Sequence, residues 1–301
     1  MCGIVGLFLK DPALEPRLGA LLSDMLIAMS DRGPDSAGIA IYGGGTPGKA
    51  KVTVQSADPE ADFRGLDGEM AAAGLAVEMV VKSTHAVLVV DAARLDDVRP
   101  LLAKLRPSLR IMGAGESVEI FKEVGLPKDV VDRFGVRTMG GTHGIGHTRM
   151  ATESAVTTLG AHPFSTGADQ CLVHNGSLSN HNNMRRDLVR RGMRFETDND
   201  SEVAAAYLTA ELSDGKDLGA ALKGALDDLD GFFTFVVGTR TGFGVLRDPI
   251  ACKPAVMAET DQYVAFGSEY CALAGLPGIE DAHIWEPEPA TVYFWDHRKA
   301  A

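Results

Sequence analysis

The chain has 301 residues, of which 45% are hydrophobic and 23% are charged, and its formal net charge is -12 at pH 7. This composition is ordinary for a folded globular protein and excludes a disordered linker. Because a net negative charge repels phosphate, and no Lys/Arg run is interleaved with aromatic residues, nucleic acid is not expected as a partner.

Three features of the sequence indicate where the protein is located: its apolar runs, its N-terminal segment and its cysteines. The runs Ala86 to Val90 and Phe232 to Val237 are too short to cross a bilayer, so they predict buried strands and no membrane partner. No basic stretch precedes the apolar N-terminal residues, so no secretion signal is expected. The four cysteines are widely spaced without a C-x-x-C pair, which argues against a metal site or disulfide scaffold. We expect a cytoplasmic protein with reduced thiols.

The first 45 residues predict a strand, a helix and a second strand. Gly3 to Leu9 is apolar and partly β-branched, which predicts a buried strand at the very start. Apolar residues at helical spacing from Leu18 to Met29 predict a helix that stops before the turn-forming Asp31-Arg32-Gly33-Pro34. Ala37 to Tyr42 predicts the next strand, ended by the glycine run 43–45.

The pattern changes over about Thr46 to Met139. A strand is predicted at His85 to Val90, a helix at Leu95 to Leu105 and a further strand near Leu109 to Met112. We interpret this stretch as an inserted α+β subdomain. Its Gly113-Ala114-Gly115 lacks the rest of a dinucleotide fingerprint, so we assign it no cofactor.

Closely spaced strands return from Gly144 onward. Helices are predicted at Ser201 to Leu212, with Ser201 as N-cap, and over the apolar stripe from Leu218 to Leu229. The hairpin signal Thr239 to Gly242 and the short spacing of the strands favour antiparallel sheets with helices packed outside them. The expected fold class is α+β.

Cys2 is the first candidate for chemistry. Removal of Met1 would leave its thiol beside a free α-amino group, whose pKa of about 7.7 to 8.0 suits it to take the thiol proton at neutral pH. Taken alone, Cys2 is equally consistent with a residue that merely follows the start codon.

His174-Asn175-Gly176 is the second candidate. Asn-Gly is first of all a signal for a hairpin turn. A turn at a strand end could also present the Asn175 amide and the Gly176 N–H together, the two donors that an oxyanion from attack on an amide requires.

Two charged residues could bind the ends of an amino acid. Arg149 follows a predicted strand, and its guanidinium could pair with an α-carboxylate, although an ordinary surface arginine has the same pattern. Asp200 precedes a helix and could hold an α-ammonium group or serve in capping. Calcium is excluded there, because Val203 stands where an EF-hand loop needs glycine. His162, before a proline, is more typical of a structural role.

Five motifs occur in order along the chain: Met1-Cys2-Gly3-Ile4-Val5-Gly6, Arg32-Gly33-Pro34-Asp35-Ser36-Ala37-Gly38, His147-Thr148-Arg149-Met150-Ala151-Thr152, His174-Asn175-Gly176 and Asp200-Ser201-Glu202. Together they resemble the class II glutamine amidotransferase family. Arg247-Asp248-Pro249, Lys253-Pro254 and Gly267-Ser268-Glu269 extend the resemblance to about residue 275. One departure is Ile250-Ala251-Cys252, which stands where many relatives carry a glycine.

The resemblance implies an N-terminal-nucleophile fold, a four-layer αββα sandwich of antiparallel sheets over residues 1–301 with the subdomain inserted at about 46–139. It implies site residues as well: the nucleophile Cys2, the oxyanion-hole residues Asn175 and Gly176, the substrate-binding residues Arg149 and Asp200, and the pocket-shaping residues Thr152 and Arg32. The substrate would be glutamine, and no metal is implied.

Within the family, the long insert and the stretch from Gly141 to Ser154 look most like glutaminase domains of the glutamate synthase kind. Among separately encoded subunits, the chain resembles the amidotransferase-like subunit of N-methylglutamate synthase, or methylamine–glutamate N-methyltransferase. This likeness implies no cofactor in the chain, and it implies glutamate-synthase-like partner subunits that carry flavin and an iron–sulfur cluster. Two other interpretations stay open: a stand-alone N-terminal-nucleophile amidohydrolase, and a non-catalytic subunit that senses glutamine or glutamate.

Overall fold

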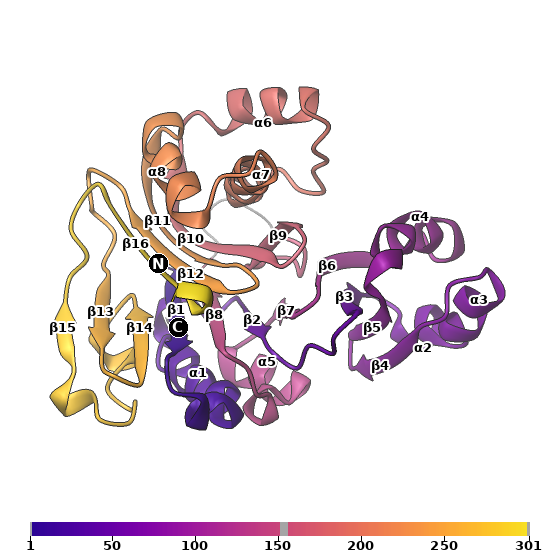
Figure 1. Ribbon diagram of the computed structural model, residues 1–301, viewed down its shortest axis with the longest axis horizontal. Coiled ribbons are helices and arrows are strands. Elements are labelled where there is room, and N and C mark those ends of the chain that lie inside the picture. Colours follow the sequence, from indigo (N-terminus) through magenta and orange to yellow (C-terminus); the bar gives the residue numbers. More distant parts are fainter. Residues whose placement is uncertain (1, 151–155, 300–301) are drawn as a thin grey trace.

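A computed structural model describes residues 2–150 and 156–299 (Figure 1). A seven-stranded sheet holds the start of the chain, in the order β15-β13-β14-β1-β8-β2-β7 with antiparallel neighbours throughout. Its strands are β1 (Gly3–Leu9), β2 (Ser36–Tyr42), β7 (Val118–Val124), β8 (His143–Arg149), β13 (Val256–Glu259), β14 (Tyr263–Gly267) and β15 (His283–Trp285). The predicted first strand is confirmed, and it lies between β8 and β14 inside this sheet.

A second, five-stranded sheet has the order β16-β12-β11-β10-β9 and is also antiparallel. Its strands are β9 (Phe164–Gly167), β10 (Gln170–Leu178), β11 (Gly231–Gly238), β12 (Gly242–Arg247) and β16 (Thr291–Asp296). The predicted hairpin joins β11 to β12, and the Thr239 N–H donates to the Gly242 carbonyl at 2.9 Å.

The two sheets lie face to face between helices, which makes four layers (Figure 1). The helices α1 (Leu18–Ile27) and α5 (Pro127–Phe134) cover the seven-stranded sheet. The helices α7 (Asp200–Ser213) and α8 (Leu218–Asp228) cover the five-stranded sheet, and α6 (His181–Arg190) packs against α7 on the outer side (Figure 1). The expected αββα sandwich is therefore the observed fold.

The side chains of strand β1 pack on both faces of the first sheet. Ile4 and Phe8 point between the two sheets, whereas Val5, Leu7 and Leu9 point toward the helices, and all five side chains are buried. Both faces of the strand are covered, so its sequence is continuously apolar rather than alternating.

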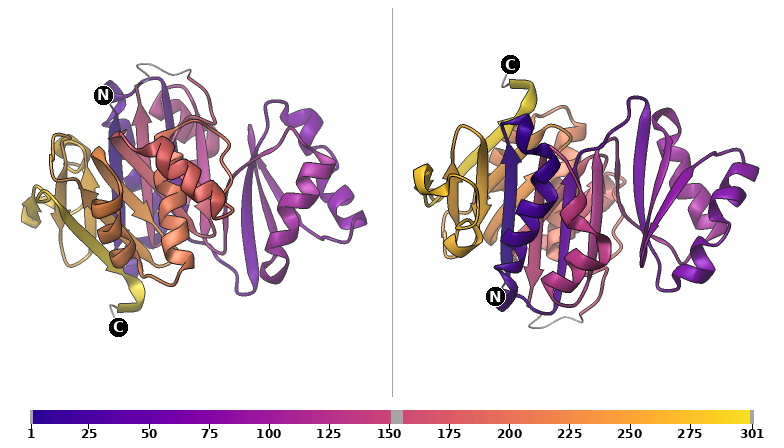
Figure 2. Two further views of the ribbon diagram at one scale, coloured as in Figure 1. Left: turned by 90° about the horizontal axis from the view of Figure 1, so that it is seen from above. Right: turned by 90° about the horizontal axis from the view of Figure 1, so that it is seen from below.

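The inserted region has a sheet and a core of its own. Its order is β4-β5-β3-β6, with strands β3 (Lys49–Gln55), β4 (Glu78–Lys82), β5 (His85–Asp91) and β6 (Arg110–Gly115). The helices α2 (Pro59–Phe63), α3 (Leu66–Ala72) and α4 (Leu95–Leu105) cover one face, around buried side chains such as Leu66 and Leu88. Figure 2 shows this region as a lobe at one end of the molecule.

The expected far boundary of the insert, near residue 139, is wrong. Strand β7 pairs with β2 along its whole length, from Ser36 opposite Val124 to Tyr42 opposite Val118, and α5 adds Phe134 to the core under the first sheet. The insert thus replaces the turn of a β2–β7 hairpin and ends by about Ser117. Periodicity marks β7 as a strand but does not say which sheet it joins.

Asp169 anchors this junction to the body. Its buried carboxylate accepts hydrogen bonds from the N–H groups of Glu116, Ser117 and Val118 at 2.8 to 3.0 Å, and from the Ser117 hydroxyl at 3.0 Å. A side chain at Gly115 would place its Cβ 2.3 Å from this carboxylate, so the close approach needs glycine.

Among the described residues, no helix is long and apolar enough to cross a membrane.

Candidate active site

Cys2 lies where the two sheets meet, just before β1. Its carbonyl oxygen accepts hydrogen bonds from Arg32 Nε at 3.0 Å and from Asn175 Nδ2 at 3.3 Å. Two residues on, the Ile4 N–H donates to Ser268 Oγ and the Ser268 N–H donates to the Ile4 carbonyl, each at 2.9 Å. The beginning of the chain is thereby fixed from both sheets.

Gly3 allows this close packing. A Cβ at Gly3 would lie 2.7 Å from Thr148 Oγ1 and 2.9 Å from Met29 Cβ, both too close for an unstrained contact. Because Gly3 pairs with Thr148 on β8, Cys2 lies at the same end of the sheet as Arg149.

Asn175 and Gly176 do not form the expected hairpin turn. Both lie inside β10, opposite Thr234 and Phe233 of β11. Gly176 has φ +149°, and a Cβ there would lie 1.9 Å from the Phe232 carbonyl oxygen, so only glycine fits. Asn-Gly here marks a distorted strand, which local turn statistics could not distinguish from a hairpin.

Asn175 lies on β10 beyond the part of the strand that pairs with β9. The described pairing of β9 with β10 stops at Leu172, so the strand has no β neighbour on that side at Asn175. The Asn175 side chain is 4% exposed and reaches Cys2. An amide has two N–H donors, so one can hold the Cys2 carbonyl while the other serves a further acceptor.

Arg149 is the last residue of β8, as expected from the sequence, but it is 7% exposed rather than a surface residue. Its carbonyl accepts from the Asp35 N–H at 3.1 Å. A Cβ at Gly33 would meet the Arg149 backbone nitrogen at 2.5 Å, and a Cβ at Gly160 would lie 3.2 Å from Arg149 Nη1. Two close-packed loops therefore hold this arginine at the strand end.

Asp200 begins α7 and contacts the end of β10. Its Oδ2 accepts from the Leu178 N–H at 2.9 Å, its Oδ1 lies 3.8 Å from His174 Nδ1, and its side chain is 22% exposed. The N-cap of α7 is Asn199, whose Oδ1 accepts from the Ser201 N–H at 2.8 Å, so the prediction of Ser201 as N-cap is wrong.

Ser201 instead joins two histidines in a buried network behind Asp200. Its hydroxyl lies 2.8 Å from His162 Nε2 and 2.9 Å from His174 Nδ1. His147 stacks on His162 with ring centroids 4.0 Å apart, and its Nε2 donates to the His174 carbonyl at 3.1 Å. The sequence predicted a structural role for His162 but not this network, since its members are far apart in the chain.

Burial keeps these histidines neutral. It lowers the pKa of His147 to about 3 and lowers those of His162 and His174. The histidines therefore act as neutral hydrogen-bonding groups at pH 7, and the Ser201 hydroxyl between them lies 3.4 Å from Asp200 Oδ1.

The Arg32 side chain contacts other residues of the chain. Besides holding the Cys2 carbonyl, it forms an ion pair with Glu269, and its Nη2 is buried without a hydrogen-bond partner in the part of the chain that the structure describes. Sequence reasoning gave Glu269 no role, although it falls within one of the motifs quoted above. The expected pocket residue Thr152 lies outside the described residues.

The loop after β12 is held by its own charged residues. The Arg247 guanidinium donates to the carbonyls of Pro287, Ala251 and Lys253, and the Asp248 carboxylate accepts from the N–H groups of Ile250 and Ala251. Ala251 has φ +53°, a conformation that favours glycine. This explains why glycine is an apt residue there.

Residues 2–150 and 156–299 contain no group of three or more His, Cys, Asp or Glu side chains arranged to hold a metal ion.

The structure thus brings Asn175 of β10 and Arg32 onto Cys2, with Arg149 at the adjoining end of β8 and Asp200 bonded to the end of β10. Comparison with known sequences points to the same chemistry. A family described as a glutamine amidotransferase domain matches residues 147–275. The glutamine amidotransferase-like protein GlxB of Rhizobium meliloti (strain 1021) is 77% identical over 301 residues, which is 100% of both chains. A putative glutamine amidotransferase of Methanothermobacter thermautotrophicus is 33% identical, over 97% of this chain and 99% of the relative.

Solved structures agree on the fold. Glutamine phosphoribosylpyrophosphate amidotransferase from B. subtilis aligns with a TM-score of 0.63 and 19% identity over 99% of this chain, and the chain spans 48% of that structure's length. A second structure, described as the allosteric regulatory enzyme of purine biosynthesis, aligns with a TM-score of 0.64 and 20% identity, and the chain spans 47% of it. The architecture is that of an N-terminal-nucleophile, class II amidotransferase. The chain belongs to the glutamine amidotransferase family.

Proposed function

We propose that this chain removes the side-chain amide of glutamine, with Cys2 as an N-terminal nucleophile after Met1 has been cleaved. The observation that carries the proposal is the hydrogen bond from Asn175 Nδ2 to the Cys2 carbonyl, which brings an amide donor to the start of the chain from a different sheet. Family membership and the flanking charges of Arg149 and Asp200 support the same substrate.

The proposed reaction has two halves. In the first, the Cys2 thiolate bonds to the amide carbon, and the resulting oxyanion accepts from Asn175 Nδ2 and the Gly176 N–H. The α-amino group of Cys2, having taken the thiol proton, returns it to the leaving nitrogen as the C–N bond breaks. In the second half, water attacks the thioester, which releases glutamate and restores the thiol.

Arg149 and Asp200 would set the specificity for a free amino acid. Arg149 can pair with the α-carboxylate, because a guanidinium matches the two carboxylate oxygens. The Asp200 carboxylate retains an exposed fraction of 22%, so it can accept from an α-ammonium group. Acylated amines would lack both partners.

The nitrogen would pass to a separate glutamate-synthase-like subunit, and the chain would act as the amidotransferase-like subunit of an N-methylglutamate synthase. Flavin and iron–sulfur chemistry would belong to the partner. Exposed apolar side chains support a docking partner: Phe232 at the start of β11 is 37% exposed, Tyr270 is 47% exposed and Ile250 is 64% exposed. Purification of the native complex tests this, since isolation of the chain alone at native expression would contradict the partner.

The amidase proposal is tested by the intact mass of the purified chain before and after treatment with a diazo-ketone analogue of glutamine, in wild type and in Cys2→Ala. We expect loss of the Met1 mass and one adduct that requires Cys2. Retained Met1 without an adduct would favour a non-catalytic sensing subunit. Turnover of acylated amines but not of glutamine would favour a stand-alone amidohydrolase.

A further inference from the structure

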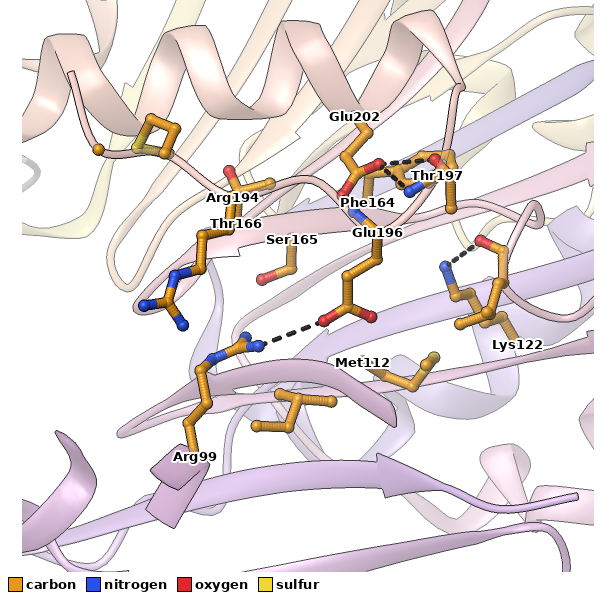
Figure 3. Close-up of a pocket in the computed structure, with 14 residues that line it drawn as sticks. Arg99, Met112, Lys122, Phe164, Ser165, Thr166, Arg194, Glu196, Thr197 and Glu202 are labelled. Atoms are coloured by element: carbon orange, nitrogen blue, oxygen red, sulfur yellow. Dashed lines mark hydrogen bonds and ion pairs between the residues drawn. The ribbon is translucent and has the colours of Figure 1, made fainter. Parts of the chain in front are cut away.

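A cavity of about 230 Å³ lies between the inserted lobe and the body, away from Cys2 (Figure 3). Its walls come from α4 and β6 of the insert, from β7 and β9 of the body, and from the segment 192–197 that leads into α7. This volume is below the roughly 300 Å³ at which sites for drug-sized ligands begin, so it suits a small metabolite.

Two arginines from opposite walls point toward one end of the cavity (Figure 3). Arg99 of α4 forms an exposed ion pair with Glu196 at 3.2 Å. Arg194 is exposed and makes no hydrogen bond or ion pair with any residue of the described chain. Met112 and Phe164 supply apolar surface to the lining of the cavity.

The buried charges of the cavity are already satisfied. Lys122 Nζ donates to the carbonyls of Leu159, Ala161 and Pro163 at 2.7 to 3.2 Å. The Glu202 carboxylate accepts from the N–H groups of Glu196 and Thr197 at 2.8 Å and from the Thr197 hydroxyl at 2.6 Å. The cations left to recognise an anion are therefore Arg194 and Arg99, and Arg99 is shared with the exposed Glu196.

We propose that this cavity binds a small carboxylate-bearing organic molecule, with the carboxylate held between Arg99 and Arg194 and the carbon chain against Met112 and Phe164. Guanidinium groups favour carboxylates because their paired N–H donors match the two oxygens. Binding draws Arg99 away from Glu196, so the ligand competes with that carboxylate for the same cation.

Two cavity walls continue into the candidate active site, and this part of the inference rests on the proposed glutaminase function. The segment that bears Arg194 and Glu196 runs through Asn199, the N-cap of α7, to Asp200. The segment held by Lys122 includes Gly160, which packs beside Arg149. We therefore expect binding of the anion to change the affinity for glutamine, and any such coupling must be reciprocal.

The test is calorimetric titration of the full chain with glutarate, and separately with inorganic phosphate. We expect saturable glutarate binding that weakens about tenfold or more in Arg194→Gln and in Arg99→Gln, since each loses a charge-assisted pair. Glu196→Gln removes the competing carboxylate and should tighten binding several-fold. Arg190→Gln, a surface arginine on α6 that pairs with Asp187, is the matched control and should bind as wild type.

Absence of glutarate binding, equal binding by both arginine variants and wild type, or tighter binding of phosphate than of glutarate would each overturn the proposal. Weaker binding by Glu196→Gln would also contradict it, because a purely structural role of the ion pair predicts that direction. Calorimetry needs no glutamine turnover, so failure of the glutaminase proposal leaves this outcome readable. With turnover present, glutarate should change KM for glutamine in wild type and not in Arg194→Gln.

Discussion

The body and the inserted lobe are both built from antiparallel strands and helices, but they differ in the number of sheets and in the polarity of their cores. The body stacks two sheets between helices, which allows residues from both sheets to meet around Cys2, and it tolerates buried polar groups such as His147, His162 and Ser201. The lobe has one sheet and one helical layer around an apolar core. It holds none of the proposed catalytic residues, and the cavity proposed to bind an anion lies at its boundary with the body. The proposed catalytic residues thus lie where the two sheets of the body meet, whereas the lobe, with a single sheet and one helical layer, contributes none of them.

The largest expected effect tests whether chemistry is confined to the body. Asn175→Ala removes the proposed oxyanion donor, so glutamine turnover should fall by about a hundredfold or more, equivalent to roughly 2.7 to 4 kcal/mol of transition-state stabilisation. Steady-state kinetics measures this. Asn182→Ala, an exposed position on α6, is the control and should keep the wild-type rate. A near-normal rate for Asn175→Ala would remove that residue from the mechanism.

A substitution in the core of the lobe tests whether the lobe unfolds separately from the body. Leu88 is fully buried on β5, so Leu88→Ala should destabilise the lobe by about 2 to 5 kcal/mol through lost burial and a residual cavity. In hydrogen-exchange measurements, we expect the amides of the lobe to exchange faster than in wild type and those of the body to keep their wild-type rates. Glutamine turnover should be retained. The exposed Val80→Ala on β4, where Val80 is 53% exposed, should change stability by less than about 0.5 kcal/mol. Early exchange throughout the body would show that the two regions unfold together.

The buried histidines make the body acid-sensitive. The folded-state pKa of His147, about 3, lies below the unfolded value of about 6.5, so the unfolded chain binds the proton first as pH falls. Its contribution to stability is full above about pH 6.5 and is lost progressively between pH 6.5 and 3, at up to about 1.4 kcal/mol per pH unit.

Urea denaturation at a series of pH values measures this slope. His147→Gln should reduce the slope over this interval, whatever it does to stability at pH 7. The exposed His283→Gln should leave the slope unchanged. A wild-type slope in His147→Gln would mean that other groups control acid unfolding.

The smallest effect concerns the link between the two regions. The side chains of Arg99 and Glu196 are 55% and 34% exposed, so their ion pair should contribute no more than about 1 kcal/mol. A double-mutant cycle of Arg99→Gln and Glu196→Gln in urea denaturation should give a coupling within this limit that shrinks with added salt. A coupling well above it would mean that the pair holds the lobe to the body.

Local sequence determined the elements and the fold class. The strand at Gly3 to Leu9, the helix at Leu95 to Leu105 and the 239–242 hairpin follow from apolar periodicity and turn residues, which are properties of neighbouring residues. The motifs also predicted a set of candidate site residues, of which Arg32 and Asn175 contact Cys2 in the structure.

Only the tertiary structure decided how these pieces meet. Strand β7 joins the body because its partner is β2, and Asn175 and Gly176 continue a strand because β11 pairs with them. Ser201 leaves the capping role to Asn199 and bonds His162 and His174 instead. Each outcome depends on a residue far away in the chain, and local periodicity carries no information about distant partners. The reach of Asn175 to Cys2 is likewise a consequence of two sheets packing face to face.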